Sequence, residues 1–459
     1  MDLFSEAIYT RRRAQLKTLV GNGQILLMGN DESSSNFEHN HYPFRQDSSF
    51  LYFFGIDRPG LVGLIDIDAN KETIFGEEAT IDDVVWTGPQ ALLADLAARV
   101  GVLDTAPLHR LSATLGATVH FLPPYRPENI LKLGAWLTKT PEAITAGWSK
   151  PLVESVVALR SVKDDGEIEE LEKASKVTAS IHLTAMKAAV RGTREFEVLA
   201  EMQHAAAMAN SSFSFPPIVT TNGQTLHNYY YGHELREGLF LCDAGGESAK
   251  HYAGDMTRTY PVATTFTTKE REIYDIVASA LQASVQAAKA DILFKEVHLQ
   301  AALVIAEGLK DLGLMKGESV EAVSAGAHAL FFPHGLGHML GLDVHDMEDL
   351  GEDLVGYDDE VSRSSQFGLK SLRLGRRLQE GFAFTIEPGI YFIPELIEKW
   401  QSEKRFADYL NYPKILGYLG FGGIRLENDY YIKHGKAELL GPAVPLTNTE
   451  VEDFRKSLD

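Results

Sequence analysis

Four segments in the second half of the chain have the apolar alternation of short strands, and each carries a carboxylate at a core or near-core position. They are Asp243 in 239–247, Asp255 in 252–262, Glu387 in 382–393 and Glu427 in 421–432. A buried charge is costly unless it is paired or bound to a metal. One such acid is readily explained as half of an ion pair, whereas four of them favour a metal site.

A glycine-rich stretch, FFPHGLGHMLGLDVHD at 331–346, strengthens this interpretation. It is too apolar for a surface loop and too polar for plain core, and it carries three histidines, His334, His338 and His345. Its glycines at 335, 337 and 341 would let the backbone pass close to metal ions. With one of these histidines, the four carboxylates would make a set of five ligands.

The charge and composition of this set indicate which metals it would bind. Four carboxylates carry four negative charges, which two divalent cations balance. Two metals about 3.5–4 Å apart can hold a hydroxide at neutral pH and polarise a carbonyl group. Oxygen-rich ligands favour manganese, with cobalt or zinc as alternatives. The chain has one cysteine, Cys242, which cannot form a thiolate zinc cage.

The acidic charge balance argues against several classes of partner. The 43 basic and 64 acidic side chains give a formal net charge of −21. Nucleic acids and anionic membrane surfaces require basic patches. No run approaches the ~18 apolar residues of a membrane span, and the N-terminal residues do not follow the signal-peptide pattern. We therefore expect a cytoplasmic protein that binds neither nucleic acid nor membranes.

Two regions differ in their patterns. Residues 1–155 mix strand-like and helical segments and are expected to form a smaller α/β domain. Helical patterns at 165–210 and 268–315 alternate with the strand-like segments, so residues 156–459 are expected to form an α+β domain. Residues 347–380 have a polar, loop-like pattern, and a loop of this length in a compact domain is often functional.

In these motifs the chain resembles the aminopeptidase P and prolidase family of metallopeptidases, which have the pita-bread fold. The matching motifs are LHNYYYG, LFLCDAGGE, YAGDMTRTYPV, FFPHGLGHMLGLDVHD, TIEPGIYF and GFGGIRLEND, together with YPFRQDSSFLYFFGI in the first region. The resemblance implies a C-terminal pita-bread domain preceded by a smaller creatinase-like α/β domain. It also implies a homodimer or homotetramer.

The resemblance assigns roles to the candidate residues. It implies that two manganese ions are held by Asp243, Asp255, His338, Glu387 and Glu427. It further implies that His227, His334 and His345 are catalytic or substrate-binding histidines that hold no metal. The alternative for each of these three is a hydrogen-bonded structural histidine. For His227, the following Asn228-Tyr229-Tyr230 departs from the usual family pattern, in which tyrosine follows the histidine directly.

The implied reaction is hydrolysis of the bond between an N-terminal residue and proline. His345, with a metal ion, would stabilise the oxyanion, and Glu387 would move a proton to the leaving proline nitrogen. Asp243 would help to hold the free amine of the substrate. Arg425 shares a strand face with Glu427 and would hold that ligand beside the substrate, with a plain cross-strand ion pair as the alternative.

The segment GLKSLRLGRRLQEG at 368–381 resembles the prolidase branch. In that branch the arginine of the SLR triplet, here Arg373, is expected to bind the carboxylate of the substrate's proline. This favours an Xaa-Pro dipeptidase. An Xaa-Pro aminopeptidase that acts on longer peptides is the alternative, because Arg373 lies near Arg376 and Arg377 and all three could belong to a solvated loop.

Two other classes of protein share this fold. One is a metal-free hydrolase similar to creatinase, and the other is a non-catalytic binding module. Family members of both classes lack parts of the acidic ligand set, whereas all five ligand positions are filled in this sequence.

Overall fold

A computed structural model describes residues 3–458, and the chain divides into two compact units. Unit 1 comprises Met1–Arg160 and Met347–Leu354, and unit 2 comprises Ser161–Asp346 and Val355–Asp459. The short second segment of unit 1 comes from the region with the loop-like sequence pattern. The domain boundary near residue 155 stays a prediction.

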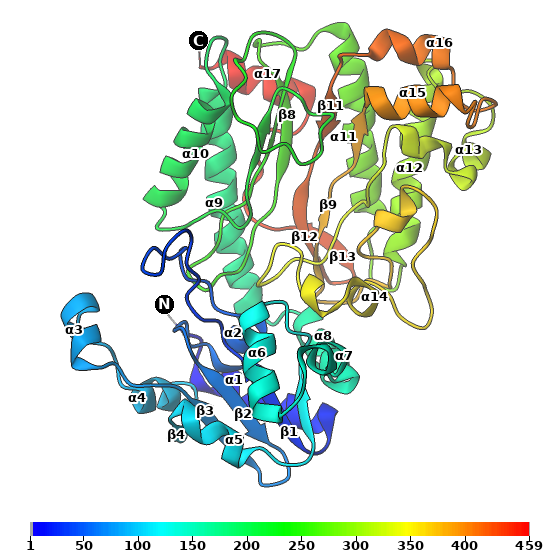
Figure 1. Ribbon diagram of the computed structural model, residues 1–459. Coiled ribbons are helices and arrows are strands. Elements are labelled where there is room, and N and C mark those ends of the chain that lie inside the picture. The colour runs from blue at the N-terminus through cyan, green and yellow to red at the C-terminus, as the bar shows by residue number, and fades with distance from the viewer. Residues whose placement is uncertain (1–2, 459) are drawn as a thin grey trace. The chain divides into compact units, whose positions relative to one another are not determined.

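Unit 1 is built on a five-stranded sheet with the order β4-β3-β2-β1-β5 (Figure 1). Strands β1, β2 and β3 are antiparallel neighbours, whereas β3–β4 and β1–β5 are parallel pairs. The strands are β1 (Gln24–Met28), β2 (Val62–Asp66), β3 (Lys71–Phe75), β4 (Asp104–Ala106) and β5 (Val119–Phe121). The helices are α1 (Glu6–Val20), α2 (Ser48–Phe54), α3 (Ile81–Thr87), α4 (Leu93–Ala98), α5 (Leu111–Thr114), α6 (Pro127–Leu137), α7 (Pro141–Ala146) and α8 (Lys150–Ser161).

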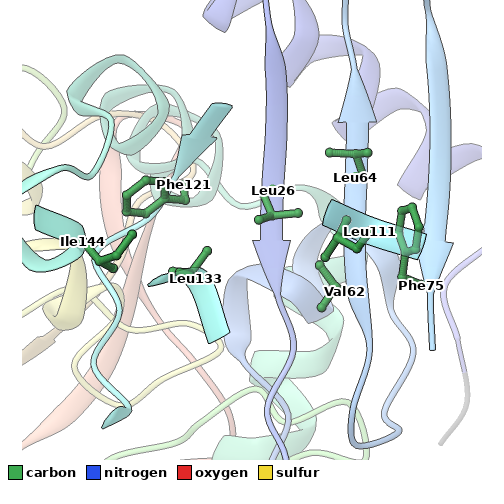
Figure 2. Close-up of a cluster of buried hydrophobic side chains, with 8 residues drawn as sticks. All are labelled: Leu26, Val62, Leu64, Phe75, Leu111, Phe121, Leu133 and Ile144. Atoms are coloured by element: carbon green, nitrogen blue, oxygen red, sulfur yellow. The ribbon is translucent and has the colours of Figure 1, made fainter. Parts of the chain in front are cut away.

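An apolar cluster lies between this sheet and helices α5, α6 and α7 (Figure 2). Val62 and Leu64 are two residues apart on β2, so both point to the same face of the sheet. The other buried members are Leu26, Phe75, Leu111, Phe121, Leu133 and Ile144. The alternation of each strand thus supplies one apolar face, which the three helices cover.

Unit 2 contains three small antiparallel sheets, with the orders β6-β7-β8, β13-β12-β9 and β10-β11. The strands are β6 (Ile218–Thr220), β7 (Leu239–Asp243), β8 (Thr257–Pro261), β9 (Ala383–Ile386), β10 (Gly389–Tyr391), β11 (Gly423–Arg425), β12 (Asn428–Lys433) and β13 (Lys436–Leu439). The helices are α9 (Asp165–Ala188), α10 (Glu195–Met208), α11 (Thr268–Ala287), α12 (Phe294–Asp311), α13 (Ser319–Ala325), α15 (Pro394–Ser402), α16 (Tyr412–Ile415) and α17 (Asn448–Lys456). Helix α14 (Glu352–Val355) falls mostly in the second segment of unit 1.

The long helices of unit 2 pack in pairs, α9 with α10 and α11 with α12, and Figure 1 shows these pairs bordering the strands. Helix α9 begins at Asp165, at the start of the helical pattern predicted at 165–210. Asp164 caps it by accepting a hydrogen bond from the backbone N–H of Glu167, and Glu167 returns one to the backbone of Asp164. No helix among residues 3–458 has the length and apolar character needed to cross a membrane.

Candidate active site

The acids chosen from the strand pattern lie at the ends of strands. Asp243 is the last residue of β7, where it pairs with Thr257 of β8. Asp255 precedes β8, so it lies outside the strand, although the pattern of 252–262 predicts it within one. Glu387 follows β9, and Glu427 lies between β11 and β12. Strand ends present side chains to a common space, whereas a mid-strand acid would face the sheet's packing partner.

These acids line one cavity of about 400 Å³. The cavity lies within unit 2, and all ten residues that the sequence suggests for the site line it: His227, Asp243, Asp255, His334, His338, His345, Arg373, Glu387, Arg425 and Glu427. The strands and the glycine-rich stretch therefore converge, although up to 200 residues separate their members. A set of carboxylates, imidazoles and guanidiniums in a single concave space is typical of a catalytic site.

The cavity wall also includes residues that were not among the ten candidates. These are Phe215, Ile218, Leu226, Tyr229, Val344 and Ser371. Most are apolar, so the cavity combines a charged floor with an apolar wall. Phe215 and Ile218 lie outside the quoted motifs, and the other four lie inside them. Nothing further in the sequence marks the apolar ones, because an apolar residue in a wall follows the same pattern as one in the core.

The glycine-rich stretch is held by backbone pairing with β9. Thr385 N donates to His338 O at 3.0 Å, and Leu340 N donates to Ala383 O at 3.0 Å. A Cβ atom at Gly337 would collide with the carbonyl oxygen of Thr385. The glycine is therefore required by close approach to a neighbouring strand. This differs from the predicted approach to metal ions, because the backbone next to His338 is itself part of the sheet.

The hydrogen bonds of His338 fix its tautomer. Nδ1 lies 3.0 Å from the carbonyl oxygen of Met339, which can only accept, so Nδ1 carries the proton. Nε2 is then left with a lone pair and lies 3.4 Å from Asp255 Oδ2 and 3.8 Å from Glu387 Oε1. An imidazole oriented by a carbonyl on one nitrogen, with its other nitrogen among carboxylates, is a typical metal ligand.

The carboxylates of the cavity have oxygens without partners. Asp243 Oδ1, Asp255 Oδ1 and Glu427 Oε1 are buried and accept no hydrogen bond. Asp255, His338 and Glu427 each offer a ligand atom, and these three atoms lie within 4.8 Å of one another. Unpartnered buried carboxylate oxygens are costly, and a divalent cation satisfies them. The residues present therefore fit divalent metal ions.

Electrostatics support the same conclusion. Burial, followed by the charge of Asp243, raises the pKa of Asp255 well above its usual value. Burial, followed by the charge of Asp255, raises the pKa of Glu427 well above its usual value, and burial also raises that of Glu387. Carboxylates that are crowded together either take up protons or bind cations. A bound cation lowers their pKa values again, so that they stay ionised.

The shared strand face suggests that Arg425 contacts Glu427, and the structure shows that this contact is indirect. The guanidinium of Arg425 donates to Asp243 Oδ2 at 2.5 Å, to Tyr391 Oη at 2.9 Å and to Thr257 Oγ1 at 3.0 Å. Thr257 in turn donates to Glu427 Oε2 at 2.6 Å. Strand β11 ends at Arg425, so the alternation of a strand does not continue to Glu427. Thr257 therefore links the two residues, and the role of Arg425 in holding Glu427 stays a prediction.

His334 is the neutral end of a hydrogen-bonded relay. Its Nδ1 lies 2.8 Å from the carbonyl oxygen of Gly335 and must donate, so Nε2 accepts from Tyr391 Oη at 2.9 Å. Tyr391 Oη accepts from Arg425 Nη1. Burial, followed by the charge of Arg425, lowers the pKa of His334 to about 3. His334 therefore stays uncharged at neutral pH.

The other two histidines occupy different parts of the cavity. The His345 ring lies against that of His338, with centroids 4.3 Å apart and planes at 69°. His227 is exposed and stacks with Tyr229, with centroids 6.4 Å apart. His345 thus lies beside a candidate metal ligand, and His227 lies on the open side of the cavity.

The three arginines of segment 368–381 have different surroundings. Arg377 pairs with Glu360 at the surface, with both side chains more than 40% exposed. Arg376 is half-buried, and Arg373 is half-buried and lines the cavity. The structure therefore separates Arg373 from a purely solvated basic loop.

The chain matches two family models. Residues 169–434 match Metallopeptidase family M24, and residues 9–121 match Aminopeptidase P, N-terminal domain. The first match includes most of unit 2 and all ten candidate residues, and the second lies within unit 1.

Similar proteins carry two related names. The chain is 30% identical over 450 residues to the Xaa-Pro dipeptidase of Homo sapiens, covering 93% of this chain and 87% of that protein. It is 32% identical to a probable Xaa-Pro aminopeptidase of Botryotinia fuckeliana, covering 95% and 90%. Among solved structures, zinc-substituted Escherichia coli aminopeptidase P in complex with product superposes with a TM-score of 0.82 at 27% identity, with full coverage of both chains.

Proposed function

This chain belongs to metallopeptidase family M24, and we propose that it hydrolyses the peptide bond between an N-terminal residue and a following proline. The family and the pita-bread fold expected from the motifs are confirmed. The observation that carries the proposal is the convergence of all ten candidate residues on one cavity. The names of the similar dipeptidase and aminopeptidases support the Xaa-Pro substrate class.

The metal centre would use the ligands that the motifs suggest. Asp243, Asp255, His338, Glu387 and Glu427 would hold two divalent ions, for which manganese is favoured over cobalt or zinc by the oxygen-rich set. When bound, such ions lower the pKa of water to give a nucleophile and polarise the scissile carbonyl. The unpartnered oxygens of three of these carboxylates support this assignment. A metal-free hydrolase or a non-catalytic module would not require them.

The remaining side chains would bind substrate and move protons. Asp243 is oriented by Arg425 through Oδ2, and as a metal ligand it would lie beside the free amine of the substrate. His345 would donate to the developing oxyanion. Glu387, whose pKa is raised by burial, suits proton transfer to the leaving proline nitrogen.

His334 and His227 would bind substrate in different ways. His334 is held neutral by its relay to Tyr391, so it would form part of the wall and contribute no charge. His227 is exposed on the open side of the cavity, where it can close over a bound peptide. Both assignments extend the roles implied by the family motifs.

Substrate length is the finer part of the proposal. Arg373 lines the cavity and can bind a carboxylate through two parallel hydrogen bonds. A dipeptide would place its proline carboxylate there, which favours a dipeptidase over an aminopeptidase for longer peptides. The test compares cleavage of Gly-Pro with cleavage of Gly-Pro-Ala by manganese-loaded enzyme. Faster cleavage of the tripeptide would favour the aminopeptidase.

We further propose that the chain forms a dimer or a tetramer through unit 1. Helix α3 buries none of its side chains, and it exposes Ile81, Val85 and Trp86 by 76%, 72% and 85%. Apolar side chains gathered on one short helix are typical of a contact surface. Sedimentation of the wild type and of Trp86→Lys tests this, with Leu103→Lys as a control because Leu103 is also exposed, by 92%, but lies outside α3.

A further inference from the structure

Lys163 and Asp346 form an ion pair in the interior of unit 2 that has no place in the proposed reaction. Lys163 Nζ lies 2.8 Å from Asp346 Oδ2, and each side chain is 1% exposed. Burying two charges is costly, and a buried pair adds little stability unless its geometry is good. Such a pair does constrain conformation strongly. Asp346 directly follows His345, so the pair lies one residue from a catalytic side chain.

The chain reverses direction around Asp346, and its backbone and side chain both hold this reversal. Asp346 N donates to Met339 O at 3.0 Å, and Gly341 N donates to Asp343 O at 3.1 Å. Asp343 N donates to Asp346 Oδ1 at 3.4 Å. A Cβ atom at Gly341 would collide with the Asp346 carboxylate, so the glycine leaves room for it. The carboxylate thus fills the inside of the turn 339–346.

The backbone of Lys163 is held just before β9, the strand that pairs with the glycine-rich stretch. Lys163 N donates to Gly381 O at 2.9 Å, just before β9, and Leu340 N donates to Ala383 O at 3.0 Å in β9. Lys163 and Asp346 therefore belong to two chain segments, and the backbones of both segments pair with the chain in or just before β9. The ion pair closes the turn 339–346 against this strand.

We propose that Lys163 is a positioning residue that holds Asp346, and through Asp346 the ring of His345, where His345 acts on the substrate. The inference rests on the proposed function, which supplies the role of His345. The centroid of the His345 ring lies 4.3 Å from that of His338, so a small movement of the turn 339–346 would change the orientation of the His345 ring. A displacement of about 1 Å in a catalytic group can cost on the order of 10²-fold in rate.

Two variants test the proposal in the full-length, manganese-loaded enzyme. Asp346→Asn keeps the shape of the side chain and removes its charge, and Lys163→Met keeps its length and removes the ammonium. Each should lower kcat for Gly-Pro by about tenfold or more, with KM and bound metal close to wild type. The thermal midpoint of the metal-free protein reports any general loss of stability separately from kcat.

A double-mutant cycle decides whether the effect passes through His345. In a His345→Ala background, Asp346→Asn should cause no further loss of kcat. The matched control is Lys250→Met, because Lys250 Nζ also lies 2.8 Å from a buried carboxylate oxygen, that of Glu170. This control should keep the wild-type kcat.

Three results would overturn the inference. The first is a wild-type kcat in both Asp346→Asn and Lys163→Met. The second is an equal loss from Asp346→Asn in the wild-type and His345→Ala backgrounds, which would make the pair a structural element only. The third is a wild-type kcat in His345→Ala itself, which contradicts the proposed function of that histidine as well. The second result leaves that function intact, so the two failures are distinguishable.

Discussion

The two units bury charge in different ways. Among the residues that the structure describes, the buried charged side chains of unit 1 are the arginines Arg12, Arg13 and Arg160. Arg13 donates to the carbonyl oxygens of Phe53 and Val100 at 2.9 and 2.8 Å and to Glu72 at 2.6 Å. Its charge is compensated within the unit.

Unit 2 buries carboxylates whose charge is not fully compensated. Asp243, Asp255 and Glu427 are each at most 8% exposed and each keep an oxygen without a hydrogen-bond partner. A domain that retains such a costly arrangement sacrifices stability for a functional site. The contrast teaches that burial of charge alone does not mark a site, whereas several unpartnered carboxylate oxygens gathered in one cavity do.

The largest effect should follow loss of a ligand in unit 2. Glu427→Ala should remove bound metal and lower kcat/KM by more than the roughly 10- to 100-fold typical of residues that only support a ligand. Metal analysis and Gly-Pro cleavage measure both. The matched change in unit 1, Glu72→Ala, breaks an ion pair at 2.6 Å but should leave metal content and activity unchanged. Equal losses in both variants would remove the contrast between the units.

The next largest effect should follow changes to His345 and His338, which have different proposed roles in the glycine-rich stretch. His345→Ala should lower kcat by about 10²–10³-fold, as for loss of one oxyanion donor, and should keep its metal. His338→Ala should instead lose metal, because its Nε2 lies among the carboxylates. Metal content and kcat measured together distinguish the two variants. Equal loss of metal would show that the roles are wrongly divided.

Arg373 should affect binding more than chemistry. A hydrogen-bonded contact with a charged group contributes about 1.5–3 kcal/mol, so Arg373→Ala should raise KM for Gly-Pro roughly 10- to 100-fold. Cleavage of Gly-Pro-Ala should change little, since its carboxylate lies one residue further along. Arg377→Ala is the control, because Arg377 pairs with Glu360 at the surface. A similar KM change for both substrates would show that Arg373 does not bind the terminal carboxylate.

The smallest effect concerns stability at low pH. Burial and the nearby His328 lower the pKa of His298 well below its usual value, and neither ring nitrogen of His298 has a hydrogen-bond partner. The folded state therefore binds this proton less readily than the unfolded state. The stability that depends on neutral His298 is fully present above pH 6.5 and is lost as the pH falls below it.

His298→Phe removes this dependence. In metal-free protein, its unfolding free energy relative to wild type should rise by up to about 1.4 kcal/mol for each pH unit below 6.5. Urea unfolding at several pH values measures the difference. His120→Phe in unit 1 is the control, since both nitrogens of His120 lie within hydrogen-bonding distance of partners. Parallel curves for wild type and His298→Phe would contradict the interpretation.

Much of the site could be predicted because its chemistry is local in sequence. Each acid lies in or beside a short apolar segment, and three of the four candidate histidines lie within one stretch, so the cost of burying them can be recognised without a structure. The start of α9 is equally local, since Asp164 and Glu167 form its cap.

What could not be predicted depends on contacts between distant segments. Thr257 links Arg425 to Glu427, and Tyr391 connects Arg425 to His334, yet neither side chain differs in pattern from a core residue. The indirect link from Arg425 to Glu427 lies where β11 ends and its alternation stops. The grouping of Met347–Leu354 with unit 1 likewise depends on tertiary packing, which a loop-like pattern does not specify.

The central claim is that the uncompensated carboxylates of unit 2 form a two-metal exopeptidase site. The most direct measurement titrates chelated protein with manganese and follows bound metal and Gly-Pro cleavage in the same samples. The account predicts no cleavage without metal, and a rate that reaches its plateau at about two ions per chain. Full activity in protein shown to be metal-free, or saturation of activity with no metal bound at these residues, would contradict it.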